Sequence, residues 1–450
     1  MRSKRMLVMA VLAAALGLAA APAGIARADV VAQLPIQNEY QIVADTAHGH
    51  LFISQGTFSS SDDSILVTDL DGNPVTTISG ENGVEGLALS PDGTTLYAAL
   101  TTGDAVSAIS TTTLQETARY PLPAGYAAYS VAPQSGMIWV SYRDAGVSEI
   151  GAIDPADTSS FTAGAVPDSW VGLPPQIAVD PSDTGVLLTA SVGVNPPSVA
   201  SFNVSNPAAV TAIASSRMIG DCTPWHGLAV APGGATFLCD GVPYGTADMS
   251  QQGFLFAGAV AAIAQNGTVA AGDAFTSQNP AATPDLYIYS SATAGSYQTA
   301  YSVEGPSSYL TDLAWSADST QLFAVIVNTD SSGTPVSYTL HVLYPPRIST
   351  TLTLTGPASG TVTGTALLTG QLTANLTPLA GAKITLTRTA AGSGATKQLF
   401  ATTAADGTFT VRDFYTKPGT YSYAASYAGD SANAPGTAGP EQVTVIRGPH

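Results

Sequence analysis

The chain of 450 residues has little cysteine, few basic residues and few long apolar runs. Its only cysteines are Cys222 and Cys239, which excludes a disulfide-dense scaffold, and their spacing matches no zinc motif. In an exported protein these two residues can form one disulfide, and the alternative is two separate buried thiols. After the first 28 residues no apolar stretch reaches the roughly 20 residues that a membrane-spanning helix needs.

The N-terminal residues have the pattern of a secretory signal peptide. Three of the first five residues are basic, residues 7–21 are apolar, and Ala26-Arg27-Ala28 matches a cleavage site. The alternative, a membrane anchor, is disfavoured because the apolar run is short and a small-residue site follows it. We therefore predict a signal peptide at residues 1–28, cleaved between Ala28 and Asp29, and a protein that is secreted or associated with the cell envelope.

Basic residues are scarce over most of the chain. Residues 29–346 contain 28 acidic residues but only Arg119, Arg143 and Arg217 as basic ones, whereas residues 347–450 contain seven basic and four acidic residues. An acidic body repels phosphate backbones, so a nucleic-acid partner is excluded. We interpret the charge as a means of solubility outside the cell, with attraction of cations or basic surfaces as the alternative.

One pattern recurs seven times between residues 42 and 325. An apolar strand is followed by a turn and a second strand, most clearly in LALSPDGTTLYAA at residues 87–99. Proline presets φ and glycine accepts positive φ, so the Pro-Asp-Gly group predicts the turn. The mean spacing of about 45 residues is typical of a four-stranded propeller blade. The other copies are residues 42–54, 130–142, 177–189, 228–240, 260–272 and 313–325.

The repeats predict how the sheets pack. One four-stranded sheet cannot bury both faces, but seven sheets packed radially can, and closure of the ring leaves only short edges. We therefore predict an all-β chain with a seven-bladed β-propeller at residues 29–346, with six or eight blades as alternatives. Residues 30–34 form a strand with no partner in the first repeat, so we expect them to complete the last blade beside residues 336–343.

The segment SPDGTTLYAA at residues 90–99 and its six weaker copies resemble the YVTN-type repeats of the wider quinoprotein-like and lactonase-like family of seven-bladed β-propellers. The resemblance extends over about residues 29–346. It implies the architecture and leaves the chemistry open. The lactonase branch implies a channel site with histidine, glutamate and arginine, and the quinoprotein branch implies an anionic redox cofactor, for which few cationic groups are present.

The composition changes at Tyr344-Pro345-Pro346-Arg347, where two prolines make a stiff junction. Short segments that alternate with period two follow, and Asp406-Gly407 is typical of a hairpin turn. These features predict a β-sandwich at residues 347–450. The run TYSYAASYAGD at residues 420–430 resembles the end of bacterial Ig-like repeats, which implies an Ig-like spacer or adhesive module.

Propeller ligands bind at the mouth of the central channel, so we aligned the residue two places before the first core position of each repeat. This ring contains one pair with acid–base potential, Glu85 and His226, and these are the candidate catalytic residues. Together with Asp312 they could hold a divalent cation. The alternative is a solvated polar ring without chemistry. The aligned ring is Tyr40, Glu85, Ala127, Pro175, His226, Ala259 and Thr311, with Gln41, Gln176 and Asp312 one place later.

The remaining candidates have simpler interpretations. Tyr40, Gln41, Gln176, Thr311, Asp312 and Trp225 are candidate ligand-binding residues, and Trp225 could stack against a sugar ring. We expect His48 and His50 to be exposed turn residues, and Asp62, Asp63, Asp69 and Asp71 to lie in two turns that flank a strand. Trp139 and Trp315 follow the strand period and should be core residues. The sequence has no GxSxG, HExxH, GxGxxG or Walker-type motif.

These observations favour a monomeric binding or scaffold protein whose ligand is an envelope or extracellular protein or glycan. Neither a cofactor nor a metal site is identified, although a divalent cation remains an alternative. The competing hypothesis is an enzyme of lactonase, lyase or hydrolase type with a site at Glu85 and His226.

Overall fold

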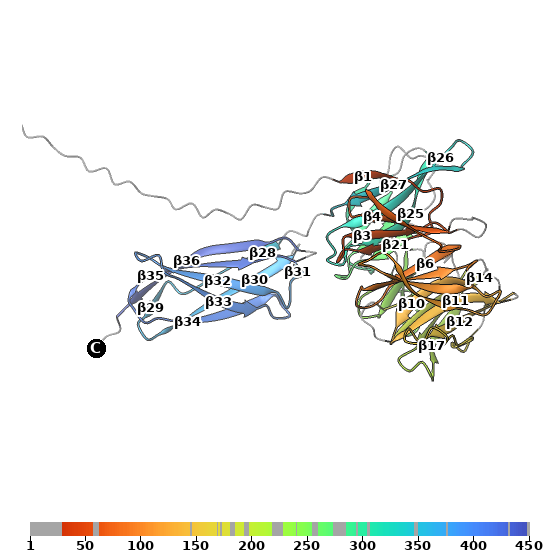
Figure 1. Cartoon of the computed structure of the whole chain (residues 1–450). Helices are drawn as coiled ribbons and strands as arrows, with labels where there is room; N and C mark the ends of the chain where they lie inside the picture. Colours follow the sequence, from red (N-terminus) through yellow and green to blue (C-terminus); the bar gives the residue numbers. More distant parts are fainter. Residues whose placement is uncertain are drawn as a thin grey trace, which may run out of the picture.

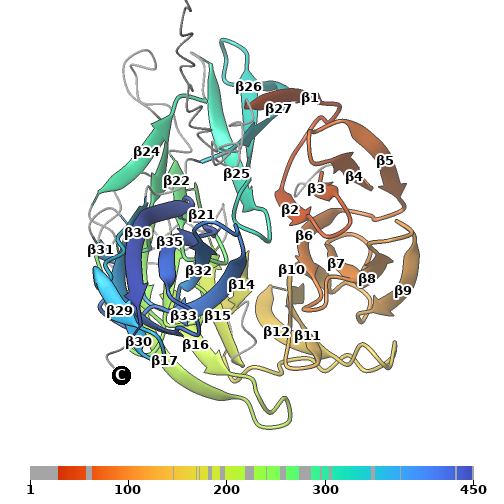
Figure 2. The ribbon, with the colours of Figure 1, turned by 90° about the vertical axis from the view of Figure 1, so that its left-hand side faces the viewer.

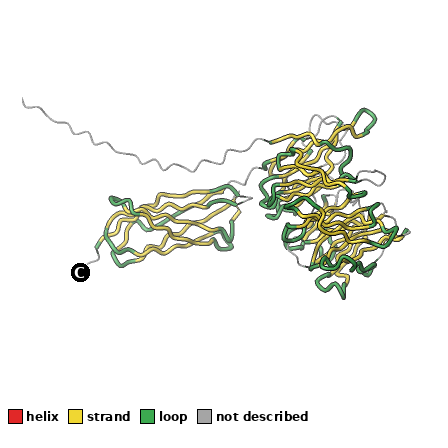
Figure 3. The backbone as a smooth tube through the Cα atoms, viewed as in Figure 1, coloured by secondary structure: helices red, strands yellow, loops and turns green. Residues whose placement is uncertain are grey.

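The computed structural model is all-β in the residues that it describes (Figure 3). None of these residues forms a helix long and apolar enough to cross a membrane. The predicted signal peptide at residues 1–28 lies outside them. The described residues are 29–56, 63–144, 146–168, 170–171, 173–180, 185–192, 198–217, 228–239, 241–253, 260–272, 285–293, 296–303, 307–345, 350–374, 377–430 and 433–447.

The first four sheets follow one another along the chain. In each of them, consecutive strands lie side by side and pair antiparallel. The first contains β2 (Gln41–Asp45), β3 (His50–Ser54), β4 (Ser64–Asp69) and β5 (Pro74–Ser79). The second contains β6 (Val84–Leu89), β7 (Thr95–Leu100), β8 (Ala105–Ser110) and β9 (Glu116–Pro121). The third contains β10 (Ala127–Gln134), β11 (Met137–Asp144), β12 (Val147–Ile153) and β13 (Trp170–Val171). The fourth contains β14 (Leu173–Val179), β15 (Val186–Val192), β16 (Ser198–Asn203) and β17 (Thr211–Arg217).

Three further sheets complete the N-terminal part of the described chain. The fifth contains the described strands β18 (Leu228–Val230), β19 (Thr236–Cys239) and β20 (Val242–Gly245). The sixth contains β21 (Val260–Ile263), β22 (Val269–Gly272), β23 (Leu286–Tyr289) and β24 (Tyr297–Tyr301). The seventh contains β25 (Ser308–Trp315), β26 (Leu322–Thr329), β27 (Pro335–Leu343) and, at its outer edge, β1 (Val30–Leu34).

The first strands of consecutive sheets form a closed ring. β2 contacts β6, and contacts continue through β10, β14, β18 and β21 to β25, which returns to β2. Figure 2 shows β25, β2, β6 and β10 facing a common centre. This arrangement is a β-propeller, and the seven predicted repeats correspond to the seven sheets between β1 and β27 of the described chain.

The prediction that residues 30–34 complete the last sheet is confirmed. β1 pairs antiparallel with β27, and Val30 lies opposite Val342 while Leu34 lies opposite Tyr338. The N-terminal end of the propeller thus joins its C-terminal end within one sheet (Figure 1). On β1, Leu34 is buried whereas Val31 is 60% exposed.

The turns explain why the repeat is visible in the sequence. In the second sheet the Asp92 carboxylate accepts hydrogen bonds from Ser90 and Thr94. In the seventh sheet Asp318 accepts the equivalent bonds from Ser316 and Thr320. These short polar side chains satisfy the backbone of the turn locally.

Apolar clusters fill the space between neighbouring sheets; one cluster, for example, contains Phe52 and Ile65 from the first sheet and Leu96 from the second. Trp139 is fully buried, as predicted. Trp315 is also predicted to be a core residue, but it is only half-buried and packs against the edge of a core cluster. Its Nε1 donates a hydrogen bond to the backbone oxygen of Ala262 at 3.2 Å.

The C-terminal residues form a second unit with a core of its own. One sheet has the order β29-β36-β35-β32-β33, and the other joins β28, β30 and β31, with β34 paired to β30. The core cluster of this unit contains only residues between Leu352 and Val445. The strands are β28 (Thr350–Leu352), β29 (Ser359–Thr361), β30 (Thr365–Ala374), β31 (Thr377–Pro378), β32 (Lys383–Ala390), β33 (Thr396–Thr402), β34 (Thr408–Phe414), β35 (Gly419–Tyr427) and β36 (Gly436–Ile446).

Candidate functional site at the central channel

A β-bulge interrupts the same part of four innermost strands. The pairing register shifts between Val84 and Leu87 in β6, between Ala128 and Ser130 in β10, between Leu173 and Gln176 in β14, and between Leu310 and Asp312 in β25. A bulge re-aims the side chains next to it, and bulges are common beside functional sites. Here they place Glu85, Tyr129, Pro175 and Thr311 at equivalent positions of their innermost strands.

Glu85 is the most perturbed of these side chains. It has no exposed surface, and neither carboxyl oxygen has a hydrogen-bond partner among the described residues. Because burial disfavours the charged form, the pKa of Glu85 is raised to about 8. At neutral pH the carboxyl group is therefore largely protonated and can donate a hydrogen bond.

Two tyrosines lie near Glu85. Gln176 Nε2 donates to the Tyr40 hydroxyl at 3.0 Å and so joins the fourth sheet to the first. Tyr129 is hydrogen-bonded to Arg143 on β11. Burial raises the pKa of both Tyr40 and Tyr129, and the nearby Glu85 carboxyl contributes in each case.

Two predicted ligand-binding residues form hydrogen bonds between neighbouring sheets. Asp312 Oδ2 accepts a hydrogen bond from the Ile42 amide at 2.8 Å, and its Oδ1 accepts one from Leu313 at 2.7 Å. Gln41 Oε1 accepts a hydrogen bond from the Leu87 amide at 2.8 Å. The seventh sheet is thereby bonded to the first, and the first to the second. Both Asp312 oxygens thus accept a backbone hydrogen bond within the protein.

A further carboxyl group lies beside Asp312. Burial raises the pKa of Glu39, the nearby Asp312 raises it further, and a hydrogen bond to Thr311 opposes the shift. The pKa of Asp312 is raised by burial, against the two backbone hydrogen bonds that favour its charged form. Glu39, Glu85 and Asp312 are thus three buried carboxyl groups whose raised pKa values make them retain protons more strongly than in water.

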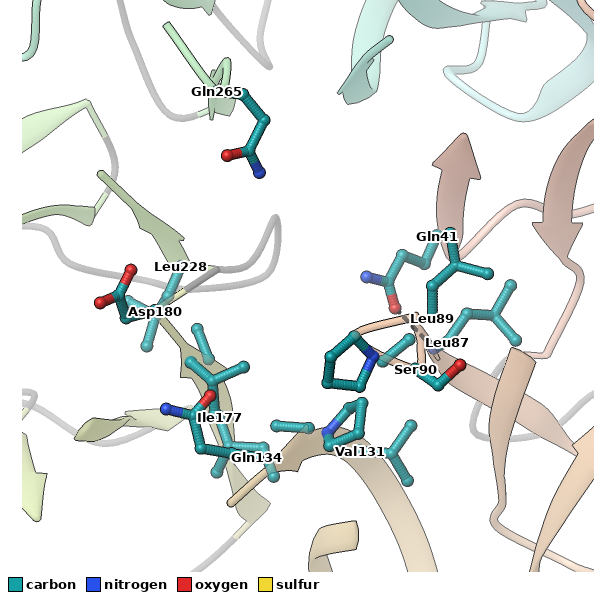
Figure 4. Close-up of a pocket in the computed structure, with 16 residues that line it drawn as sticks. Gln41, Leu87, Leu89, Ser90, Val131, Gln134, Ile177, Asp180, Leu228 and Gln265 are labelled. Carbon is teal, nitrogen blue, oxygen red and sulfur yellow. Dashed lines mark hydrogen bonds between the residues drawn. The ribbon is translucent and has the colours of Figure 1, made fainter. Parts of the chain in front are cut away.

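The channel contains a cavity of about 400 Å³ beyond these residues (Figure 4). Six of the seven sheets contribute to its wall, mostly through the later halves of their innermost strands and the turns that follow them. The volume lies in the range of roughly 300–1,000 Å³ that is usual for small-molecule sites. The lining residues are Gln41, Leu87, Ala88, Leu89, Ser90, Pro91, Val131, Ala132, Pro133, Gln134, Ile177, Ala178, Val179, Asp180, Leu228 and Gln265.

The structure tests only part of the predicted site. Tyr40, Glu85 and Gln176 come together, and Thr311 and Asp312 lie close to Glu39. His226, Trp225, Ala259 and Cys222 lie outside the described residues, so the acid–base pair of Glu85 with His226 stays a prediction. Cys239 is buried in β19, and its pairing with Cys222 stays a prediction for the same reason.

The predicted ring position in the third repeat is wrong by two residues. Pro133 lies within β10 opposite Ile138, and the turn is formed by Ser135 and Gly136, both with positive φ. The proline therefore does not mark the turn here as it does in the second repeat, and Tyr129 takes the place expected for Ala127.

Sequence analysis missed Tyr129, Glu39 and the proximity of Arg143 to the ring. Counting back two places from Val131, which lines the cavity as Leu87 does, would have found Tyr129. Arg143 lies opposite Ala127 on the adjacent strand and so reaches Tyr129 from a second strand. No comparable signal identifies Glu39, which precedes β2.

The described residues contain no group of three or more histidine, cysteine or acidic side chains arranged to hold a metal ion. His48 Nδ1 lies 2.8 Å from Asp45 Oδ2 in the first turn, whereas His50 lies on β3 against Phe52 rather than in an exposed turn. Asp69 accepts hydrogen bonds from Asp71 and Asn73 and so caps its own turn.

No family model matches the chain, and no curated protein matches it. Among solved structures, the chain is similar to the β-propeller domain of Cps50 (Swd1) from Myceliophteria thermophila, with 11% identity, a TM-score of 0.47, and coverage of 70% of this chain and all of that one. The chain is also similar to hydrazine synthase from Kuenenia stuttgartiensis, with 14% identity, a TM-score of 0.45, and coverage of 70% of this chain and 97% of that one. A third similar structure is a putative 6-phosphogluconolactonase from Bacteroides uniformis, with 12% identity, a TM-score of 0.36, and coverage of 47% of this chain and 68% of that one. These proteins differ in kind, so similarity selects no activity for this chain.

Proposed function

We propose that the protein is an exported ligand-binding protein whose propeller channel binds a small molecule. One observation carries this proposal: a cavity of about 400 Å³ at the centre of the ring is lined by both apolar and polar side chains, which six sheets contribute. Leu87, Val131 and Ile177 supply apolar surface, whereas Gln134 and Asp180 supply polar groups. This combination is characteristic of small-molecule sites, where apolar surface contributes affinity and polar groups fix orientation.

The test is a thermal-shift screen of the intact protein against a library of metabolites, lactones, sugars and divalent metal salts. A ligand that binds only the folded state raises the melting temperature by mass action. Each compound that stabilises the parent is measured again with Ala178→Trp, which places a large side chain in the cavity. We expect this variant to remain folded and to lose the response.

Ala209→Trp is the matched control, because Ala209 is exposed in the turn between β16 and β17, away from the cavity. It should respond as the parent does. If the responses of all stabilising compounds survive in Ala178→Trp, or if no compound stabilises the parent, the channel is not the binding site and the proposal fails.

A second candidate function is catalysis at the other part of the channel. Its specific support is Glu85, a buried carboxyl group whose pKa of about 8 suits a general acid at neutral pH, near Tyr40 and Tyr129. Arg143, which is hydrogen-bonded to Tyr129, would supply the positive charge that a developing oxyanion requires. The reaction would then be of lactonase, lyase or hydrolase type.

Lactone and ester turnover by the parent and by Glu85→Gln tests this candidate. A general-acid role predicts a roughly 10²–10⁴-fold loss of kcat in the variant with the fold retained. Equal turnover, or none in the parent, would leave binding as the function.

We extend the proposal to the C-terminal unit as an Ig-like spacer or attachment module. The support is its two sheets around one core and the sequence run at residues 420–430. An isolated protein of residues 350–450 tested for adhesion to cell-wall material would distinguish attachment from spacing.

A further inference from the structure

A groove of about 440 Å³ lies on the outer face of the C-terminal unit, where β30 pairs with β34. In this ladder Thr365 lies opposite Phe414, and Leu367 lies opposite Arg412. Ala366, which stands between Thr365 and Leu367, belongs to the core cluster. Successive side chains of a strand point to opposite faces, so the four paired residues share the face turned away from the core. The residues that line the groove are Thr365, Leu367, Arg412, Asp413 and Phe414.

Two large apolar side chains of the groove are open to solvent. Leu367 is 48% exposed, and Phe414 is 50% exposed. The two residues are diagonal neighbours across the ladder, because Leu367 lies opposite Arg412, two places from Phe414. Diagonal neighbours are roughly 7–8 Å apart, which is within reach of an aromatic side chain. A partner that covers both residues removes this apolar surface from water, and that burial favours binding.

The groove also carries an excess of positive charge. Arg412 is exposed, and no acidic side chain in the described part of the unit forms an ion pair with it. The carboxylate of Asp413 is buried instead, and it accepts hydrogen bonds from Arg388 and Lys397, each at 2.8 Å. Three cationic side chains thus accompany a single carboxylate, and Arg412 is the one that remains available to an anionic partner.

The charge of the whole chain restricts the size of that partner. Residues 347–450 contain seven basic and four acidic residues, whereas residues 29–346 contain 28 acidic and three basic ones. An anion is therefore attracted to the C-terminal unit and repelled by the propeller. A long polyanion such as a nucleic acid meets both effects, but a short anionic group that fits within the groove meets mainly the attraction, because charges are screened beyond about 8 Å at physiological salt.

The same face continues beyond the groove with uncharged polar side chains. Thr369 lies opposite Thr410, and Gln371 lies opposite Thr408. Hydroxyl and carboxamide groups both donate and accept hydrogen bonds, as the hydroxyl groups of a glycan do. An acidic peptide would instead place further carboxylates along a ladder face on which Arg412 is the only charged residue.

We propose that this groove binds an acidic sugar residue within an otherwise neutral extracellular glycan. The planar guanidinium of Arg412 matches a carboxylate in bidentate geometry. The apolar face of the sugar ring packs on Phe414 and Leu367, and the neighbouring sugars lie along the uncharged part of the ladder. This inference rests on the proposed attachment role of the C-terminal unit, because it names the surface and the chemistry of the partner.

The experiment compares glycans that share a skeleton but differ in charge. Calorimetric titration of the intact protein uses a galacturonate trimer and its fully methyl-esterified, neutral form. A xylotriose that carries one glucuronate and plain xylotriose form a second pair. We expect at least one of the two acidic glycans to bind, and its neutral counterpart to bind at least tenfold more weakly.

Two variants test the residues of the groove. Arg412→Gln removes the guanidinium, and Phe414→Thr removes the aromatic ring but keeps a residue that suits a strand. Both residues are exposed, so the melting temperature should stay close to that of the parent while the affinity for the acidic glycan falls by at least tenfold. Lys383→Gln is the matched control, because it removes one positive charge from exposed β32 surface outside the groove. It should change the affinity less than twofold.

Three results would overturn the inference: equal affinity for an acidic glycan and its neutral counterpart, unchanged affinity in Arg412→Gln, or an equal loss in Lys383→Gln. Tighter binding of triglutamate, or of phosphatidylcholine vesicles that contain one quarter phosphatidylglycerol, would assign the groove to a peptide or a lipid surface and overturn it as well.

Adhesion of the same proteins to cell-wall material separates this inference from the role on which it rests. If neither acidic glycan binds but the parent and Arg412→Gln adhere equally, the inference fails and the attachment role stands. If the parent neither binds an acidic glycan nor adheres, both fail.

Discussion

Asp312 on β25 joins two sheets through one carboxylate. Its position shows how a polar residue directly before the first core residue of an innermost strand can bond to the next sheet. It accepts the Ile42 amide of the next sheet, and Gln41 does the same for Leu87. In the second sheet Gly86 stands at this place, and a Cβ there would lie 2.6 Å from the Tyr129 oxygen. The ring position after each bulge is thus adapted to contact between sheets.

Replacing Asp312 with alanine should therefore destabilise the propeller. The Ile42 amide would lose its acceptor, and leaving a buried donor unsatisfied costs about 1–3 kcal/mol. Urea denaturation measures the change in the free energy of unfolding. Asp330→Ala is the control, since Asp330 caps an exposed turn, and it should cost less. Equal costs would show that the bond between sheets adds nothing.

Glu85 should make the stability of the protein depend on pH. Its pKa is raised from 4.5 to about 8, so between these values the folded protein holds a proton that the unfolded chain has lost. The contribution of Glu85 to the free energy of unfolding is therefore fully present below pH 4.5 and is lost as the pH rises toward 8. Glu39 and Asp312, whose pKa values are also raised, add to the same trend.

Glu85→Gln removes one titrating group and should flatten this dependence by at least about 1.4 kcal/mol, the equivalent of one pKa unit. Denaturation curves between pH 5 and 8 measure the slope. Asp157→Asn should leave the slope as in the parent, because hydrogen bonds from Ser159 hold the pKa of this exposed carboxylate below its usual value of 3.8 and therefore outside the interval. A parent whose stability rises with pH over this interval would contradict the assignment of Glu85.

At the scale of elements, β1 closes the ring by completing the seventh sheet. Leu34 on this strand is 4% exposed and packs in a cluster with residues of the first and seventh sheets, whereas Val31 is 60% exposed. Leu34→Ala should lower the free energy of unfolding by about 2–5 kcal/mol, as is usual for a buried leucine. Val31→Ala should stay within roughly 0.5 kcal/mol of the parent. Similar effects of both substitutions would show that β1 contributes little to closure.

The sequence predicts the elements of the propeller better than its site. Turn residues such as Asp92 and Gly93 act locally, so the repeat and the closing strand could be recognised from the sequence alone. The bulges in β6, β10, β14 and β25 depend on pairing with the adjacent strand, which no local pattern records. The same limit hides the exact ring position in the third repeat, where Pro133 lies in a strand rather than a turn.

At the scale of the whole molecule, the propeller and the C-terminal unit have separate cores. In the C-terminal core Asp413 accepts hydrogen bonds from Arg388, Lys397 and Tyr423, each at 2.8 Å. These partners hold the pKa of Asp413 below its usual value, against the effect of burial. The carboxylate thus links β34 to three other strands of the unit.

Asp413→Ala should unfold or strongly weaken the C-terminal unit while the propeller stays intact. Removing one member of a buried ion pair costs about 3–5 kcal/mol. Calorimetry should show one transition moved to lower temperature and the other unchanged. A single transition that shifts as a whole would mean that the two units unfold together.

The most direct test of the central claim is a crystal structure of the intact protein grown with the compound that stabilises it most. We expect density for that compound in the channel cavity, in contact with Leu87, Val131 and Ile177. Density at the outer surface of the propeller or on the C-terminal unit, with only solvent in the channel, would contradict it.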